Sequence, residues 1–237
     1  MQEIFYSVLA MFSALLGTFI VLKFSQWSRN NSILLIGFAA GVMLSIAFVH
    51  LLPESVEHSS NAIIYAFLGF LAMFTIQYFI FFHPCHDEHC GVHLGTLSTL
   101  GLSLHSFFDG IVISVGFGAN AYIGFMTTLA IMLHKLPDGI TITGILMHSK
   151  KSMKKILCYS FVVAFFTPIG TFIGMLFSSQ ITHLVGNFLA FTAGTFIYLS
   201  AADLIPETHK VSNKKAGICL FVGVVLVCVL GYIAGNH

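Results

Sequence analysis

Two short segments of the sequence place histidine and aspartate at the same spacing. The segments "LHSFFDGIVIS" (104–114) and "LHKLPDGITIT" (133–143) match without a gap at Leu, His, Asp, Gly and Ile. Residues four positions apart in a helix share one face, about 6 Å apart along the axis. Each segment therefore presents a ring nitrogen and a carboxylate oxygen side by side. The residues concerned are His105 and Asp109 in the first segment, and His134 and Asp138 in the second.

Two helices that face each other with these pairs would offer four ligands to one divalent cation. Two carboxylates close together repel each other and take up protons, and a cation between them relieves that repulsion. A set of two imidazoles and two carboxylates suits Zn²⁺, and it can also take Cd²⁺, Fe²⁺ or Mn²⁺. A structural His–Asp hydrogen bond would explain a single pair. Because the pair occurs twice at identical spacing, we predict a metal site.

The second segment also carries a lysine and a proline among apolar residues. An amine in such a setting must pair with a carboxylate, lose its proton or line water. Lys135 precedes Asp138 by three positions and can bond to it, so we expect Lys135 to modulate the site by excluding a second cation. A direct role in proton coupling is the alternative. Pro137 lacks an N–H group and should loosen the helix beside the site.

The composition identifies the elements that must hold these residues. Of the 237 residues, 57% are hydrophobic and 8% are charged, which is typical of an integral membrane protein. A bilayer core takes about 20 apolar residues per helix. We therefore expect an all-α integral membrane fold of eight transmembrane helices, forming a single transmembrane domain (1–237) that passes repeatedly through the cell membrane. The predicted spans are 4–24, 33–52, 62–82, 95–118, 122–147, 156–178, 184–202 and 216–234.

The basic residues predict the orientation of these spans. The loops after spans 1, 5 and 7 hold every lysine and arginine except Lys135, and the loops after spans 2, 4 and 6 hold none. The positive-inside rule then places the odd-numbered loops in the cytoplasm and both termini outside. With a net charge of +1 and no long basic stripe, the chain has the lipid bilayer and a metal ion as expected partners, and no nucleic acid.

A second internal repeat relates spans 2 and 7. The segment "AGVMLSIAFVHLLPES" (40–55) aligns with "AGTFIYLSAADLIPET" (193–208), which lies 153 residues later. The two copies run in opposite directions through the membrane, so we predict inverted repeats in a 3+2+3 arrangement, as in many secondary transporters. By orientation, we interpret the ends of these spans as an entrance and an exit, with helix capping as the alternative. The entrance residues are His50 and Glu54, and the exit residues are Asp203, Glu207 and His209.

A loop at 83–93, on the cytoplasmic side by span parity, is dense in potential metal ligands. These are His83, Cys85, His86, His89, Cys90 and His93. Their spacing does not match a closed structural zinc motif. We interpret the segment as a metal acceptor or sensor, with an ordinary solvated loop as the alternative. No structural disulfide is expected.

The motifs "HSFFDG" and "HKLPDG" on spans 4 and 5, with "HLLPE" and "DLIPE" ending spans 2 and 7, resemble the ZIP family of divalent metal (zinc and iron) transporters. The resemblance covers all eight spans and points to the branch with His-Ser on span 4 and His-Lys on span 5. It implies a primary site of the four residues above, with Ser106 at its edge. Lys135 stands where the family typically has a second acid, which argues against two adjacent metals. Spans 1, 4, 5 and 6 would move against spans 2, 3, 7 and 8.

The function expected from these features is secondary import of a divalent metal, Zn²⁺ first, into the cytosol by alternating access. No ATP-binding motif is visible, and import of a dication along the membrane potential gains about 4.6 kcal/mol per 100 mV. Two alternatives remain open: an intramembrane zinc-dependent hydrolase and a metal-sensing membrane scaffold. The sequence lacks the H-E-x-x-H motif and a glutamate beside either histidine, so we expect no enzyme. A homodimer is an open alternative to a monomer.

Overall fold

The computed structural model describes residues 2–80, 90–177, 184–210 and 214–235. Every regular element within these ranges is a helix, and no strand occurs in them. Eight helical segments are long and apolar enough to cross a membrane. The predicted all-α fold with eight spans is therefore confirmed, and the protein is a multi-pass membrane protein.

Several spans are built from more than one helical segment. The elements are α1 (Gln2–Lys23), α2 (Ser25–Asn30), α3 (Ser32–Ser45), η1 (Ile46–Leu51), α4 (Leu52–His58), α5 (Ala62–Ile80), α6 (Cys90–Ala119), α7 (Ala121–His148), α8 (Met153–Leu176), α10 (Val185–Tyr198), η3 (Leu199–Leu204), α11 (Ile205–Lys210) and α12 (Lys214–Gly235). The second span runs through α3, η1 and α4, and the seventh through α10, η3 and α11.

The second and seventh spans extend further than the sequence suggested. The prediction ended them at 52 and 202, before Pro53 and Pro206, but the helices continue to His58 and Lys210. A proline ring clashes with the carbonyl four residues earlier in a regular helix. Here a π-helical turn, η1 or η3, precedes each proline, and its wider hydrogen-bonding pattern lets the helix pass the proline.

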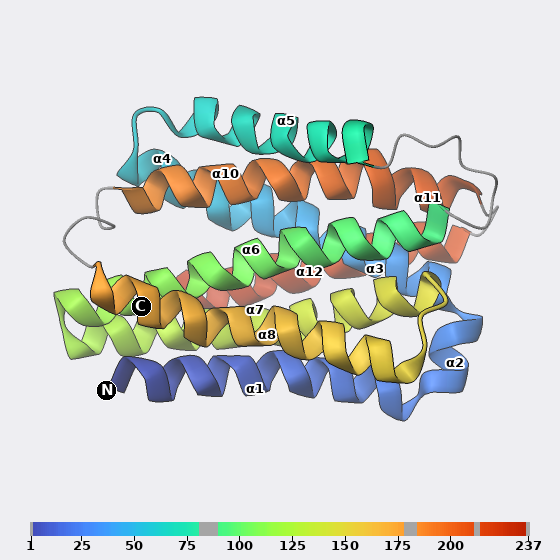
Figure 1. Ribbon diagram of the computed structural model, residues 1–237, viewed down its shortest axis with the longest axis horizontal. Helices are drawn as coiled ribbons and strands as arrows, with labels where there is room; N and C mark the ends of the chain where they lie inside the picture. Colours follow the sequence, from blue (N-terminus) through green and yellow to red (C-terminus); the bar gives the residue numbers. More distant parts are fainter. Residues whose placement is uncertain (1, 81–89, 178–183, 211–213, 236–237) are drawn as a thin grey trace.

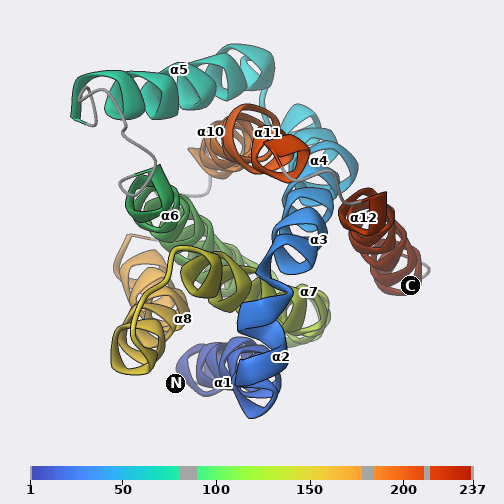
Figure 2. The same ribbon diagram turned by 90° about the vertical axis from the view of Figure 1, so that its right-hand side faces the viewer.

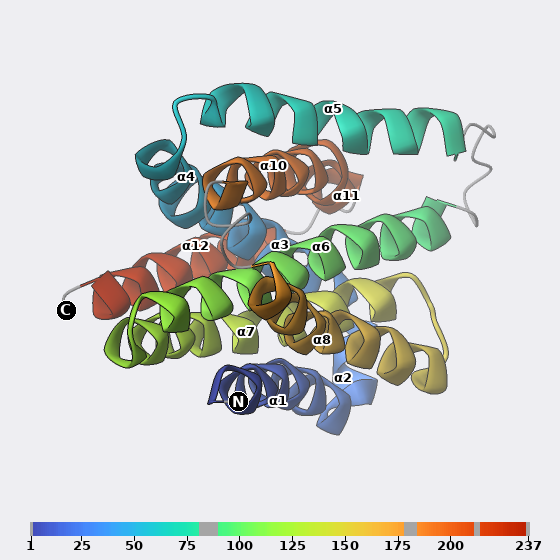
Figure 3. The same cartoon turned by 60° about the vertical axis from the view of Figure 1, so that its left-hand side comes forward.

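The helices form two groups that meet at the centre of the molecule. Viewed from one end, α1, α6, α7 and α8 pack together, and α3–α4, α5, α10–α11 and α12 pack as a second group (Figure 2). Figure 3 shows α6 running between α10 and α7. In the most apolar 18-residue stretch of the spans of α6 and α7, 67% of the residues are buried inside the protein. The corresponding share is 17% in the spans of α5 and α12. The outer helices thus face lipid, and the helices with the His–Asp pairs are central.

The internal repeats reappear in the bounds of the elements. The succession α3, η1 and α4 begins at Ser32, and the succession α10, η3 and α11 begins 153 residues later at Val185. Each π-helical turn occupies the matching position in its copy. The two spans run in opposite directions along the molecule (Figure 1). The shared position of the π-helical turns shows that the repeat governs backbone geometry as well as side-chain pattern.

The basic segments lie together at one end of the molecule. Both chain termini are at one end in Figure 1, whereas α2, the turn from α7 to α8 and α11 are at the other. The Arg29 guanidinium after α1 donates a hydrogen bond to the carbonyl oxygen of Lys151 after α7, at 3.0 Å. The lysines and arginines on which the predicted orientation depends are therefore gathered at one end of the folded chain.

Candidate metal centre

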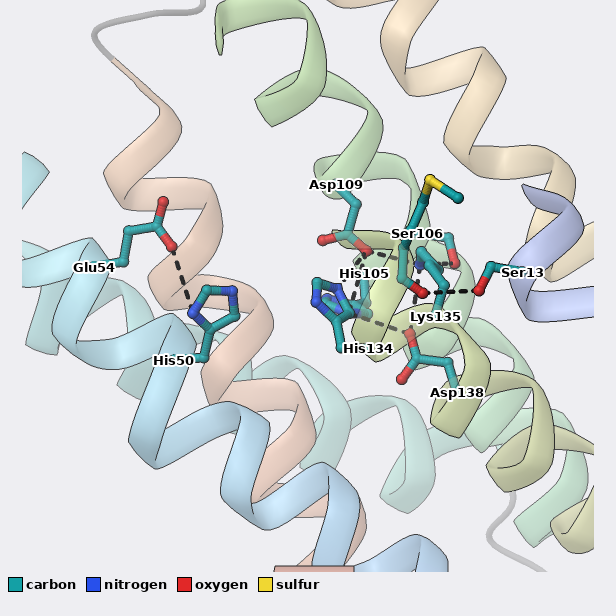
Figure 4. A network of polar contacts seen from close by, with 10 residues as sticks. Ser13, His50, Glu54, His105, Ser106, Asp109, His134, Lys135 and Asp138 are labelled. Carbon is teal, nitrogen blue, oxygen red and sulfur yellow. Dashed lines mark hydrogen bonds and ion pairs between the residues drawn. The ribbon is translucent and has the colours of Figure 1, made fainter. Parts of the chain in front are cut away.

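The four predicted ligands form one buried cluster at the centre of the molecule. The antiparallel helices α6 and α7 each present their His–Asp pair on the face that meets the other helix (Figure 4). All four side chains are buried, and one potential ligand atom from each lies within 4.8 Å of the others. It is the one group of three or more such side chains in the described part of the chain that can hold a metal ion.

The distances within the cluster suit a four-coordinate zinc ion. His105 Nε2 lies 3.3 Å from Asp109 Oδ2 and 3.5 Å from Asp138 Oδ2. His134 Nε2 lies 3.4 Å from Asp109 Oδ2. Ligand atoms about 2.1 Å from a tetrahedral zinc ion are about 3.4 Å from one another. The side chains therefore have nearly the separations that a bound metal would require.

Some polar atoms of the cluster have no hydrogen bond within the described ranges. They are both ring nitrogens of His105 and one carboxylate oxygen of Asp138, Oδ1. Buried polar groups normally have partners, because an unsatisfied one costs about 1–3 kcal/mol. A cation shared by the two aspartates would use the lone pairs that the surrounding protein leaves free.

Lys135 lies inside the cluster. Its ammonium is 2.7 Å from Asp109 Oδ2 and 3.5 Å from Asp138 Oδ2, and it donates a 2.8 Å hydrogen bond to Ser106 Oγ. The side chain is fully buried, with 0% exposed. The sequence prediction placed Lys135 beside Asp138, but the shorter contact is to Asp109 on the other helix. Ser106, predicted at the edge of the site, is the hydroxyl that orients this amine.

The loosening expected at Pro137 is accompanied by a hydrogen bond from a neighbouring helix. Pro137 lies inside α7, and the Ser13 hydroxyl of α1 donates to the carbonyl oxygen of Met132 at 2.8 Å (Figure 4). Ser13 was not singled out from the sequence. Its hydroxyl supports the backbone of α7 one turn before the proline, which helps to hold His134 and Asp138 in place.

The second helix group covers the cluster. The Phe196 ring of α10 lies 4.8 Å from the His105 ring, centroid to centroid. On η1, the His50 ring lies 5.6 Å from the His134 ring. His50 also places its Nδ1 3.8 Å from Glu54 Oε2 on α4. Of the two predicted entrance residues, His50 therefore lies beside the centre, and Glu54 lies one turn further along the same span.

A cavity adjoins the cluster on the side of the chain termini. It has a volume of about 200 Å³ and lies between α3–η1, α7 and α12. Its lining residues are Ile46, Val49, His50, Ala130, His134, Val227, Leu230 and Gly231. Among the described residues that line the cavity, His50 and His134 are thus the titratable ones, and the others are apolar.

The structure does not bring the predicted exit residues to the cluster. Asp203 Oδ1 accepts a 2.9 Å hydrogen bond from Gln77 of α5, and Tyr198 donates to the same glutamine. Glu207 pairs with His148 at the end of α7 and with Lys210, at 3.2 and 2.8 Å. His209 is exposed on α11. These residues lie at the end of the molecule that carries the basic segments.

Sequence reasoning missed two of these partners, His148 and Gln77. His148 contacts Ser32 of α3 as well as Glu207, so it joins the two helix groups. Its one signal in the sequence is an imidazole at the end of a span, immediately before a basic loop. The partners are 116 and 59 residues away, so spacing alone could not have identified them.

Most of the predicted loop ligands lie outside the described residues. This applies to His83, Cys85, His86 and His89. Cys90 and His93 fall within the bounds of α6, but their side chains are not described. The proposed role of the segment 83–93 stays a prediction from sequence.

The fold and the site first define a class: a multi-pass helical membrane protein with a buried set of ligands for a divalent metal ion. Comparison with known proteins then gives the family. The family model described as ZIP Zinc transporter matches residues 84–231. The zinc transporter ZupT of Chlorobium phaeovibrioides is 30% identical over 240 residues, which cover 90% of each protein. The ZupT of Chlorobium limicola is 29% identical over 253 residues, covering 94% of this chain and 95% of that protein.

A third relative matches over a shorter stretch. Protein zntA of Dictyostelium discoideum is 34% identical over 140 residues, which are 55% of this chain and 28% of the Dictyostelium protein. The chain thus spans little more than a quarter of that relative. The match to the family model and the similarity to the ZupT proteins show that the chain belongs to the ZIP family of zinc transporters. These are transporters and not enzymes, so the hydrolase alternative is rejected.

Proposed function

We propose that this chain is a secondary transporter that imports a divalent metal, Zn²⁺ first, into the cytosol across the cell membrane. The observation that carries the proposal is the buried four-ligand cluster on the central helices, at the interface between the two helix groups. Ionisable side chains in the middle of a membrane protein are costly and mark ion pathways. The ligand set can also take Cd²⁺, Fe²⁺ and Mn²⁺ as substrates, although it favours Zn²⁺ over them.

The two ends of the molecule support transport by alternating access. On the side of the chain termini, the cavity reaches His134 and His50. On the opposite side, His148 of α7 bonds Glu207 of α11 and closes the contact between the helix groups. With the termini outside, this arrangement offers the site to the exterior and closes it to the cytosol. Movement of α1, α6, α7 and α8 against the other group would close the site to the exterior and open it to the cytosol.

The pathway roles follow from these positions. His50 and Glu54 capture the ion in the outer cavity and pass it to His134 and its partners. Glu207 and His209 receive it at the cytoplasmic end once the contact with His148 opens. Asp203, held by Gln77, acts there through position and charge rather than as a ligand of the central site.

Three further features complete the proposal. The His-Ser and His-Lys sequences at positions 105–106 and 134–135 assign the chain to the corresponding branch of the family. The segment 83–93 acts as a cytoplasmic metal acceptor that tunes transport. The chain works as a single transmembrane domain, alone or as a homodimer.

The central test is metal uptake into proteoliposomes that hold the purified chain. Zn²⁺, Cd²⁺, Fe²⁺ and Mn²⁺ are offered separately under an inside-negative potential. We expect the wild-type chain to take up zinc without ATP. His134→Ala should lower the zinc flux by about tenfold or more, because it removes one of the four proposed ligands. Asp109→Ala should lose at least as much, but it also leaves the Lys135 ammonium without its nearest carboxylate.

His134→Ala is therefore the decisive variant, since it leaves the ion pair between Lys135 and Asp109 intact. A control is Gln26→Ala, which removes a polar side chain from the exposed surface of α2. Its flux should stay within about twofold of the wild type, as is usual for substitutions away from buried features. Wild-type flux in both His134→Ala and Asp109→Ala would reject the site.

A further inference from the structure

The Lys135 ammonium and a metal ion would compete for the same carboxylate oxygen. Asp109 Oδ2 lies 2.7 Å from Lys135 Nζ, and it is also the oxygen that both histidine Nε2 atoms approach, at 3.3 and 3.4 Å. Lys135 is held to Asp138 and Ser106 as well, at 3.5 and 2.8 Å. The ammonium therefore occupies the polar centre itself, in the place where a dication would neutralise the aspartates.

Lys135 changes the net charge of the centre both when the centre is empty and when it holds a metal ion. Histidines that bind a metal are neutral. With the histidines also neutral in the empty centre, two ionised aspartates and one ammonium give a net charge of −1 without metal and +1 with a dication. If the lysine were neutral or absent, the same centre would carry −2 when empty and 0 when loaded.

This difference bears on the energy of moving the site within the membrane. The cost of burying charge rises steeply with its magnitude, roughly as its square. A centre without the lysine would be inexpensive to move when loaded and very costly to move when empty. With the lysine, the empty and loaded centres carry charges of equal size. Lys135 therefore brings the two costs close together.

We propose that Lys135 is a tethered counter-cation that lets the empty carrier return across the membrane. The proposal rests on the proposed transport function and deepens it. The ammonium holds Asp109 between cycles, and an incoming metal ion displaces it toward Ser106 and Asp138. The flexible four-carbon stem of lysine permits this shift without movement of the helices. Because the ammonium stays inside the centre, it also repels a second dication.

A membrane potential then drives both halves of the cycle in the useful direction. An inside-negative potential pulls the loaded centre, at +1, toward the cytosol, and it pushes the empty centre, at −1, back toward the outside. A transporter whose loaded centre is neutral would have only its return step assisted in this way.

The experiment compares net uptake with exchange in proteoliposomes that hold Lys135→Met. Net uptake of zinc into metal-free vesicles requires the empty carrier to return in every cycle. Exchange of isotopically labelled zinc against vesicles preloaded with zinc uses loaded carriers in both directions. We expect net uptake to fall at least about tenfold while exchange stays within about twofold of the wild type, because only the empty state gains charge.

Lys135→Arg keeps the positive charge and should restore at least half of the net uptake lost in Lys135→Met. Lys154→Met removes the same amine from the exposed start of α8 and should leave both fluxes unchanged. If Lys135→Met does not survive purification, Lys135→Gln replaces it, since the amide keeps a hydrogen-bond donor and loses the charge. The expected split between the two fluxes is the same.

Each remaining outcome contradicts the proposal in a recognisable way. An equal loss of exchange and net uptake would make Lys135 a structural or metal-binding residue, and unchanged fluxes would make its charge irrelevant. Failure of arginine to rescue net uptake would reject a role based on charge. Absence of both fluxes in the wild-type chain would instead reject the transport function itself.

Discussion

At the scale of residues, one carboxylate oxygen organises the polar centre. Asp109 Oδ2 lies within 3.4 Å of both histidine Nε2 atoms and 2.7 Å from the Lys135 ammonium. Removing one partner of a buried ion pair typically costs about 3–5 kcal/mol. Asp109 is therefore both a proposed metal ligand and a structural residue, and variants at this position report on both roles.

His50 allows the pathway to be tested apart from the centre. Its ring lines the cavity beside His134 but belongs to the opposite helix group. We expect His50→Ala to raise the KM for zinc by about tenfold with little change in kcat, because it weakens capture of the ion while the four central ligands stay in place. Initial rates of zinc uptake over a range of concentrations measure both constants.

Val49→Ala is the matched control, since Val49 lines the same cavity and offers no ligand. Its KM should stay within about twofold of the wild type. A fall in kcat with unchanged KM in His50→Ala would place this histidine in the transport step and remove it from the entrance.

At the scale of elements, glycines set how closely the central helices approach their neighbours. A methyl group on Gly139 would overlap the carbonyl oxygen of Ala14 in α1, and one on Gly110 would overlap that of Thr167 in α8. The Thr171 hydroxyl donates to the carbonyl oxygen of Gly110 at 2.9 Å. The two contacts hold α6 and α7 in place directly behind Asp109 and Asp138.

Gly110→Ala and Gly139→Ala should therefore destabilise the protein. Overpacking of this kind costs about 1–3 kcal/mol, because the backbones must move apart. The shift would show as a lower midpoint of thermal unfolding for the detergent-solubilised chain. Gly217→Ala in α12 is the control, since a methyl group there has no neighbour within 4 Å. Equal midpoints for all three variants would mean that the central helices do not need this close approach.

At the scale of the whole molecule, the internal repeats and the charge distribution are both arranged along the long direction of the helices. The two copies related by 153 residues run in opposite directions, and the basic segments gather at the end away from the termini. An inverted repeat allows a single fold to open toward either side by exchanging the conformations of its halves. The orientation in the membrane then decides which direction of opening is import.

The orientation can be tested with cysteines at the two ends. Asn61→Cys lies in the exposed turn between α4 and α5, and Lys154→Cys lies at the basic end. We expect a charged, membrane-impermeant maleimide to label Asn61→Cys in intact cells and Lys154→Cys only after permeabilisation, since the basic end faces the cytosol. The parent chain gives the background from its own cysteines. The reverse labelling pattern would turn the proposed importer into an exporter.

Composition and residue spacing by themselves determine the class of this protein. The eight apolar runs indicate transmembrane helices, because runs of about 20 apolar residues match the length of a spanning helix and exceed that of a barrel strand. The repeated His–Asp spacing singled out the four candidate ligands, since local helix geometry alone puts residues four apart on one face. The repeats of 29 and 153 residues indicated which spans correspond.

Contacts between distant parts of the chain were decided only by the tertiary structure. Spacing placed Lys135 near Asp138, but packing of α6 on α7 brought it closer to Asp109. The second span was expected to end at 52, yet the helix continues to His58, and packing of the helix groups brings His50 on η1 against His134. The contact between His148 and Glu207 depends on how two helix groups meet. Local sequence determines which atoms share a helix face, whereas only the packing of helices determines which faces meet.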